Sequence, residues 1–250
     1  MDPRFDQITF CLVHPENPGN IGSAARAMKN MGFTRLALVS PSDPRGEESI
    51  RMAYRSHDIL DQARLFPDLS SALSKAEWVV AVSGRKQKEG GNESIETLAP
   101  EIWERATHQK ITFLFGPEGS GLTNETLSRC HRTAFIPTGP LFSSLNLSQA
   151  VLLVAAALLR ASLSESLWEG SVPPRPAAPV GEMEPFFQEM EQALEAIGFL
   201  KPAESTHRPA SKTITRRLRK IFMRAEADLE EVKLLRAMFR RMIRAMERKK

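Results

Sequence analysis

Three short segments of this 250-residue chain combine glycines with polar side chains that can hold a phosphate, a sugar or a planar ligand. The first segment covers residues 17–26. Its Gly19 and Gly22 allow the backbone to approach another segment or a phosphate, and Arg26 can hold a phosphate through two parallel hydrogen bonds. The alternative is a tight turn with a surface arginine. The spacing matches neither the GxGxxG loop nor the Walker loop.

The second segment, residues 115–123, contains three glycines and a proline within six residues. A loop of this composition can wrap a planar ligand with backbone donors and acceptors. It can equally be an ordinary turn between a strand and a helix, with Thr123 or Asn124 as the N-cap. It is not a GxSxG nucleophile elbow, because Glu118 rather than glycine stands two residues before Ser120.

The third segment, residues 140–149, places Ser143, Ser144 and Asn146 just before a strongly apolar stretch. These side chains can cap the following helix and donate hydrogen bonds to a ligand. Capping alone requires only one of them. Elsewhere, Cys130 and His131 have no second pair at zinc spacing, and the scattered histidines form no convincing triad, so we expect no metal site.

The surrounding pattern predicts an α/β fold. Strands are expected at residues 8–13, 36–39, 78–83, 111–115 and 134–136, and helices at 22–31, 69–75, 102–107, 124–130 and 147–161. The strands are continuous apolar runs, which is typical of a parallel sheet covered by helices on both faces. Each of the three segments follows a strand, and open α/β sheets bind ligands beyond the carboxyl ends of their strands.

The chain changes character after residue 163. Residues 164–182 are rich in proline and predict a linker, so we expect a catalytic domain over 1–163 and a helical C-terminal domain over 183–250. A helix is expected at 184–197, and an apolar stripe from Ile214 to residue 246 predicts a long amphipathic helix that requires a partner: the 184–197 helix, the main domain or a second chain. Asp228 and Glu231 resemble a capping box that divides this stripe into two helices.

Charge is distributed unevenly between the two parts. Residues 201–250 hold 16 Lys and Arg against 6 Asp and Glu, a net charge of +10, whereas residues 1–200 hold 18 against 24, a net charge of −6. A basic segment on an acidic body indicates a polyanion such as nucleic acid, an acidic membrane surface, or only a solvated helix. We expect a cytoplasmic protein without a membrane anchor. The chain has only two cysteines, it shows no basic leader before an apolar run, and no apolar run is long enough to span a bilayer.

The three segments, read as NPGNIGSAARAMKNMGF, FLFGPEGSGLTNETL and IPTGPLFSSLNLSQAV, resemble in order and spacing the signature motifs of the SPOUT RNA 2′-O-ribose methyltransferases, a TrmH-like family. The resemblance covers about residues 8–162. The linker and the basic helical segment are similar to those of the branch that methylates nucleotide 32 in the tRNA anticodon loop. The resemblance implies a trefoil knot near the C-terminal end of the sheet domain, S-adenosylmethionine as cofactor, tRNA as substrate, and a homodimer with the active site at the subunit interface.

The resemblance also assigns roles to individual residues. Those implied for the cofactor pocket are Val82, Ser83, Gly84, Gly116, Ile136, Ser143, Ser144 and Leu145. Those implied for catalysis or for shaping the site are Arg26, Ser144, Asn146, Asn20 and Glu118. Arg26 is expected either to orient and help deprotonate the 2′-hydroxyl or only to position an RNA phosphate. Two other functions share the motifs: methylation of ribosomal RNA, and RNA binding without catalysis.

Overall fold

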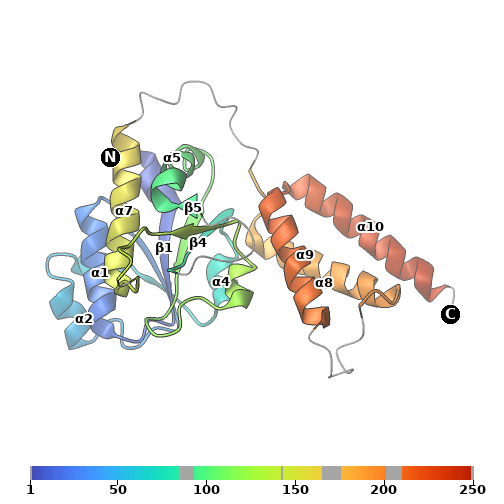
Figure 1. The fold of residues 1–250 in the computed structure, drawn as a ribbon, viewed down its shortest axis with the longest axis horizontal. Helices are drawn as coiled ribbons and strands as arrows, with labels where there is room; N and C mark the ends of the chain where they lie inside the picture. The colour runs from blue at the N-terminus through green and yellow to red at the C-terminus, as the bar shows by residue number, and fades with distance from the viewer. Residues whose placement is uncertain (1, 85–92, 142, 165–175, 201–209, 249–250) are drawn as a thin grey trace.

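The computed structural model describes residues 2–84, 93–141, 143–164, 176–200 and 210–248, and in them the sheet has seven strands. The strands are β1 (Ile8–Val13), β2 (Arg35–Val39), β3 (Arg64–Phe66), β4 (Trp78–Val82), β5 (Glu93–Ser94), β6 (Ile111–Phe115) and β7 (Arg132–Phe135). Their order across the sheet is β3-β2-β1-β6-β4-β7-β5, and every neighbouring pair is parallel. The predicted parallel α/β sheet is therefore confirmed (Figure 1).

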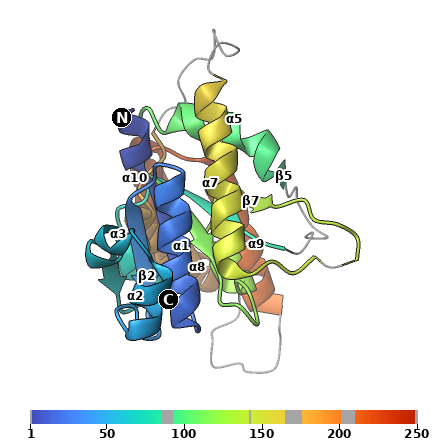
Figure 2. The ribbon, with the colours of Figure 1, turned by 90° about the vertical axis from the view of Figure 1, so that its left-hand side faces the viewer.

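Helices cover both faces of this sheet. The helices before the linker are η1 (Pro3–Gln7), α1 (Pro18–Asn30), α2 (Glu47–Met52), α3 (His57–Asp61), α4 (Leu69–Leu73), α5 (Ile95–Arg105), α6 (Asn124–Leu127) and α7 (Leu147–Leu163). After the linker come α8 (Val180–Ala196), α9 (Ala210–Ala225) and α10 (Leu229–Glu247). Figure 2 shows α1, α7 and α5 on one face, and α4 lies with the C-terminal helices on the other (Figure 1). No helix of the described residues is long and apolar enough to cross a membrane.

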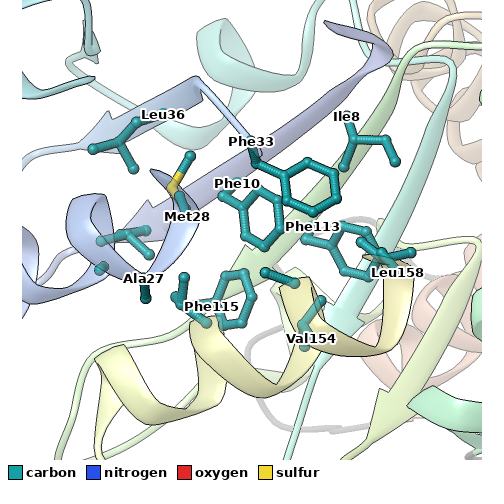
Figure 3. Close-up of a cluster of buried hydrophobic side chains, with 14 of the residues drawn as sticks. Ile8, Phe10, Ala27, Met28, Phe33, Leu36, Phe113, Phe115, Val154 and Leu158 are labelled. Atoms are coloured by element: carbon teal, nitrogen blue, oxygen red, sulfur yellow. The ribbon is translucent and has the colours of Figure 1, made fainter. Parts of the chain in front are cut away.

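Alternation along β1 divides its side chains between two cores. Ile8, Phe10 and Leu12 point into the core beneath α1, α5 and α7, where Phe10 stacks against the rings of Phe113 and Phe115 at centroid distances of 5.7 and 5.9 Å (Figure 3). Cys11 and Val13 point into the opposite core. Burial on both faces explains why the strands read as continuous apolar runs.

The second core joins the C-terminal helices to the sheet. Phe186 and Met190 of α8, Met223 of α9 and Phe239 of α10 belong to the same buried cluster as Leu114 of β6. Of the three partners expected for the amphipathic stripe, the structure therefore provides two: α8 and the main domain. The predicted break in the stripe is confirmed, because Asp228 and Glu231 form the capping box of α10.

A buried ion cluster fixes the turn between α9 and α10. Glu226 contacts Arg105 at 2.7 Å and Arg132 at 2.9 Å, and it accepts a hydrogen bond of 3.0 Å from the indole N–H of Trp78. Arg105 is only 7% exposed. The carboxylate of the C-terminal segment therefore neutralises cations of the sheet domain, and this contact holds the segment at the amino ends of β4 and β7.

Some helix boundaries differ from the sequence expectation. Helix α1 begins at Pro18 rather than at residue 22, because the Asn17 side chain accepts hydrogen bonds from the N–H groups of Gly19 and Asn20 and proline fits the first helical position. Helix α5 begins at Ile95, seven residues earlier than expected. Helix α8 begins at Val180, within the expected linker, of which residues 165–175 lie outside the described residues.

Candidate active site

A cavity of about 770 Å³ lies beyond the carboxyl ends of β4, β6 and β7. The residues after β4, the loop after β6 and the segment after β7 form its walls, so the second and third segments meet there as the parallel topology predicts. All eight residues predicted for the cofactor line this one cavity: Val82, Ser83, Gly84, Gly116, Ile136, Ser143, Ser144 and Leu145.

The chemistry of the lining suits an adenosine-bearing cofactor. Val82, Ile136 and Leu145 provide apolar surface for a base, while the glycine-rich backbone and the hydroxyls of Ser143 and Ser144 provide hydrogen-bonding groups. Apolar walls with a few convergent polar groups are the usual composition of a cofactor pocket. The residues present therefore fit S-adenosylmethionine.

The loop after β6 folds back on itself and requires glycine at two positions. A Cβ on Gly116 would lie 2.4 Å from the carbonyl carbon of Gly121 and from the Leu122 nitrogen. Gly121 has φ +67° and donates a hydrogen bond of 2.9 Å to the carbonyl of Pro117. Side chains are therefore excluded by close approach at Gly116 and disfavoured by conformation at Gly121.

A chain of three side chains connects all three segments. Glu118 accepts a 2.8 Å hydrogen bond from the Asn20 amide nitrogen, and the Asn20 amide oxygen accepts one of 2.8 Å from Asn146. Glu118 also accepts from the backbone N–H groups of Glu16 and Asn17 at 3.0 and 3.3 Å. Asn20 and Glu118, predicted to shape the site, thus lie together with Asn146, predicted to lie near the reacting ribose, and the three residues hold the three segments against one another.

The surroundings of Glu118 keep it ionised at neutral pH. Partial burial acts to raise the pKa of its carboxyl group, but the hydrogen bonds from Asn20 and from the backbone N–H groups outweigh this effect and hold the pKa below its usual value. An ionised carboxylate with a low pKa is a poor proton acceptor at neutral pH. Within this structure Glu118 holds the first and second segments together through its hydrogen bonds.

Asn146 also begins helix α7. Its side chain accepts from the Ser148 backbone N–H, and its own backbone N–H donates to the Gln149 side-chain oxygen, which completes a capping box. One residue thus satisfies the helix end, as the sequence suggested it could. Ser143 and Ser144 are exposed to the cavity rather than used as caps.

Three predicted residues do not line this cavity: Asn20, Asn146 and Arg26. Asn20 and Asn146 are connected to it through Glu118, which does line it, whereas Arg26 has no such connection among the described residues. It is exposed on α1, with its guanidinium carbon 5.9 Å from the centre of the Tyr54 ring. The glycines near it serve helix packing, because a Cβ on Gly22 would lie 2.1 Å from the Ser49 carbonyl oxygen of α2. The first segment is therefore the start of a helix packed on α2, not a loop that cradles a phosphate.

The structure adds a wall that the sequence reasoning missed. Thr213, Arg216, Arg217 and Lys220 of α9 also line the cavity. The signal was present in the amphipathic stripe: apolar positions at Ile214, Leu218 and Ile221 leave the residues between them on another face of the helix. The stripe alone does not specify which surface this polar face meets, because that depends on how the C-terminal segment docks on the sheet domain.

The weak metal and cysteine signals have structural explanations. Burial lowers the pKa of His131 to about 3, so its ring is neutral, and Nδ1 accepts a 3.0 Å hydrogen bond from the Val79 N–H. Burial raises the pKa of the Cys11 and Cys130 thiols to about 12. Across the described residues no group of three or more His, Cys, Asp or Glu side chains could hold a metal ion.

Comparison with known proteins agrees with this geometry. Residues 7–156 match the model of the SpoU rRNA Methylase family. The chain belongs to the SpoU methylase family. Residues 181–250 match the C-terminal domain of the tRNA methyltransferase TrmJ, the branch to which the linker and basic segment pointed. The RNA methyltransferase resemblance predicted from the motifs is confirmed.

The relatives extend over both parts of the chain. The tRNA (cytidine/uridine-2′-O-)-methyltransferase TrmJ of Pectobacterium atrosepticum is 33% identical over 243 residues, covering 92% of this chain and 94% of its own. The crystal structure of TrmJ from Z. mobilis ZM4 has a TM-score of 0.79 at 31% identity, covering 94% and 98% of the two chains. A structure described as giving insights into 2-OH methylation of C/U34 on tRNA has a TM-score of 0.51 at 28% identity and covers only 63% of this chain.

Proposed function

We propose that this protein is a tRNA methyltransferase that transfers the methyl group of S-adenosylmethionine to the ribose 2′-oxygen of cytidine or uridine at position 32. The observation that carries the proposal is the cavity in which the loops after β4, β6 and β7 meet, lined by all eight residues expected around the cofactor. The match of residues 181–250 to the TrmJ C-terminal domain favours tRNA over ribosomal RNA.

The protein's contribution is alignment and proton removal. When bound, S-adenosylmethionine supplies a methyl group already activated by its sulfonium. Ile136 and Leu145, which line the cavity, would pack on the adenine, and the Gly116 backbone would hold the adenosine. Ser144 lines the cavity, and its hydroxyl would donate to the reacting ribose, while Asn146, connected to the cavity through Asn20 and Glu118, would orient the sugar. Holding the 2′-oxygen in line in this way removes much of the entropic barrier to transfer.

Arg26 acts on the phosphate beside the reacting ribose, and it orients the 2′-hydroxyl or assists its deprotonation. The arginine guanidinium stays protonated at neutral pH and has no free lone pair to accept a proton, so positioning is its first role. Because Arg26 lies outside the cavity of its own chain, we infer a homodimer in which this side chain reaches the cavity of a second copy. Exposed apolar side chains near α1 and α7, among them Tyr54 and Leu153, support such an interface.

The basic C-terminal segment contributes phosphate contacts. Arg216, Arg217 and Lys220 place positive charge on the cavity wall, where they bind the phosphates that flank the target nucleotide. Division of the chain into a methyltransferase domain over 1–163, a linker over 164–182 and a helical domain over 183–250 is part of this proposal. So are a trefoil knot around the cavity and a cytoplasmic location. A knot there would bring the segment after β7 close to the residue after β4, and the Ser143 carbonyl does lie 3.7 Å from a Cβ built on Gly84.

The test is transfer of labelled methyl from S-adenosylmethionine to unmodified tRNA and, in parallel, to ribosomal RNA. We expect transfer to tRNA alone, with the methyl on ribose. Methylation of ribosomal RNA alone would overturn the assignment of tRNA as the substrate but would leave the proposed reaction unchanged. Failure to bind S-adenosylmethionine in calorimetry would overturn the cofactor site itself.

A further inference from the structure

A second hollow, of about 450 Å³, lies at the amino ends of the strands, and residues of α4 form part of its wall. Thr9 of β1 lies in it on the same face of the sheet as Cys11, which belongs to the core shared with the C-terminal helices. A strand of six residues is about 20 Å long, so this hollow and the cofactor cavity lie at opposite ends of the sheet. The proposed methyl transfer uses none of its residues.

The floor of the hollow is a polar row across three neighbouring strands. The register pairs Thr112 of β6 with Thr9 of β1, and Thr9 with Arg35 of β2. Two residues further along the same face, Leu114, Cys11 and Ala37 belong to the second core. The face therefore changes from apolar to polar at this row, and residues of α4 form part of the wall beside it.

The two threonine hydroxyls have no partner within the part of the chain that the structure describes. Thr9 is 9% exposed and Thr112 is 7% exposed, and both line the hollow. Buried hydroxyl groups in proteins nearly always have a hydrogen-bond partner. Two such groups side by side on the wall of a hollow can donate to the acceptor oxygens of a ligand.

Four cations surround these hydroxyls. Arg35, Arg64, Lys75 and Lys110 line the hollow, all four are exposed, and none has an ion pair with a carboxylate among the described residues. Asp6 is the acidic residue that lines it. Unpaired cations gathered on a part of the chain with net charge −6 mark this surface as an anion site.

We propose that this hollow binds backbone phosphates of the substrate RNA, outside the reacting nucleotide. Arginine, lysine and threonine are the side chains that commonly contact nucleic-acid phosphates. The site is open and its cations are exposed, which suits a backbone passing across it. The same face carries the C-terminal segment with net charge +10, so one RNA can contact both surfaces. The inference rests on the proposed function, because it takes tRNA as the substrate.

The test measures tRNA affinity by fluorescence anisotropy over a series of KCl concentrations. Arg64→Gln and Lys75→Gln are each expected to lower affinity about 3- to 10-fold near physiological salt and to reduce the slope of log K against log salt by about 0.7 to 0.9. Lys75→Arg should retain both. The matched control is Lys29→Gln, which removes one exposed charge from α1 on the other face and should leave the slope unchanged.

Thr112→Val separates a binding role from a structural one. Because the hydroxyl has no protein partner, the melting temperature should not fall, whereas tRNA affinity should fall about 2-fold. The variants should raise KM for tRNA and leave kcat and S-adenosylmethionine affinity unchanged. Unaltered salt slopes in Arg64→Gln and Lys75→Gln would overturn the inference. So would an affinity for tRNA that stays the same when tripolyphosphate occupies the hollow. Failure of the proposed function is distinguishable, because the wild-type protein would then transfer no methyl to tRNA.

Discussion

Arg26 and Glu118 are both motif residues, but their surroundings differ. Glu118 has every carboxylate oxygen engaged by donors from Glu16, Asn17 and Asn20. Arg26 is exposed and contacts the ring of Tyr54. The first residue holds the protein's own loops in place, whereas the second is available to a ligand. Residue identity in a motif therefore does not by itself distinguish positioning from catalysis.

Substitution of Arg26 by lysine tests its role. Arg26→Lys keeps the charge and removes the planar fork that holds a phosphate with two bonds. We expect the rate of methyl transfer to fall about 100-fold, as misplacement of a reacting group does, with unchanged S-adenosylmethionine affinity. Arg55→Lys, which alters the other arginine on the Tyr54 ring, is the control. Turnover close to wild type in Arg26→Lys would reject the bidentate role.

Substitution of Glu118 by glutamine tests the connection between the loops. The glutamine amide NH₂ would face the N–H groups that now donate to the Glu118 carboxylate, so some of these hydrogen bonds would be lost. A lost hydrogen bond at a buried group costs about 1–3 kcal/mol. We expect S-adenosylmethionine affinity, measured by calorimetry, to fall about 10-fold (about 1.4 kcal/mol). Glu125→Gln, at an exposed carboxylate of α6, should bind normally. Equal affinities in the two variants would mean that the network does not shape the cavity.

At the scale of elements, the sequence predicts buried strands well and helix starts poorly. Strand β1 was predicted at its observed bounds because both its faces are apolar. Helix α1 was predicted four residues late, because its first turn, from Pro18 to Ile21, looks like a loop until the Asn17 cap is recognised. Strand β3 and helices α2 and α3 were not predicted, since short, partly exposed elements carry little periodicity.

Gly22 shows how tertiary contact reverses a local preference. Alanine within a helix is normally about 1 kcal/mol more favourable than glycine. At Gly22, however, a methyl group would lie 2.1 Å from the backbone oxygen of Ser49. We expect Gly22→Ala to lower the free energy of unfolding in urea by about 2 kcal/mol. Gly119→Ala, where an added Cβ meets no atom within 4 Å, should change it by less than about 0.5 kcal/mol; a stabilised Gly22→Ala would refute the close packing.

At the scale of the whole molecule, the C-terminal segment is part of the same structure as the catalytic sheet. Its charge and its helices could be predicted from composition and periodicity. The location of its docking surface could not, because Glu226 and its partners Arg105 and Arg132 lie about 90 to 120 residues apart in sequence. The cations that α9 adds to the cavity were missed for the same reason. Contacts between distant segments leave no local pattern.

Removal of the Glu226 charge tests this docking. Glu226→Gln leaves buried Arg105 with Glu101 as its remaining ion-pair partner among the described residues. Because removing one partner from a buried group of ion pairs is strongly destabilising, and both Arg105 and Arg132 lose a partner, we expect the free energy of unfolding to fall by about 3 kcal/mol, measured in urea. Glu230→Gln, at a side chain that is 81% exposed, should change it by less than about 0.5 kcal/mol. Equal stability of both variants would show that the ion cluster does not anchor the segment.

The central claim is that the cavity directs methyl transfer to one ribose oxygen in tRNA. It is tested most directly with a tRNA that carries a single 2′-deoxyribose at nucleotide 32, incubated with the protein and labelled S-adenosylmethionine. A control tRNA carries the deoxyribose at nucleotide 34. The account predicts no incorporation into the first RNA and full incorporation into the second. Label in the RNA that lacks the 2′-oxygen at position 32 would contradict it.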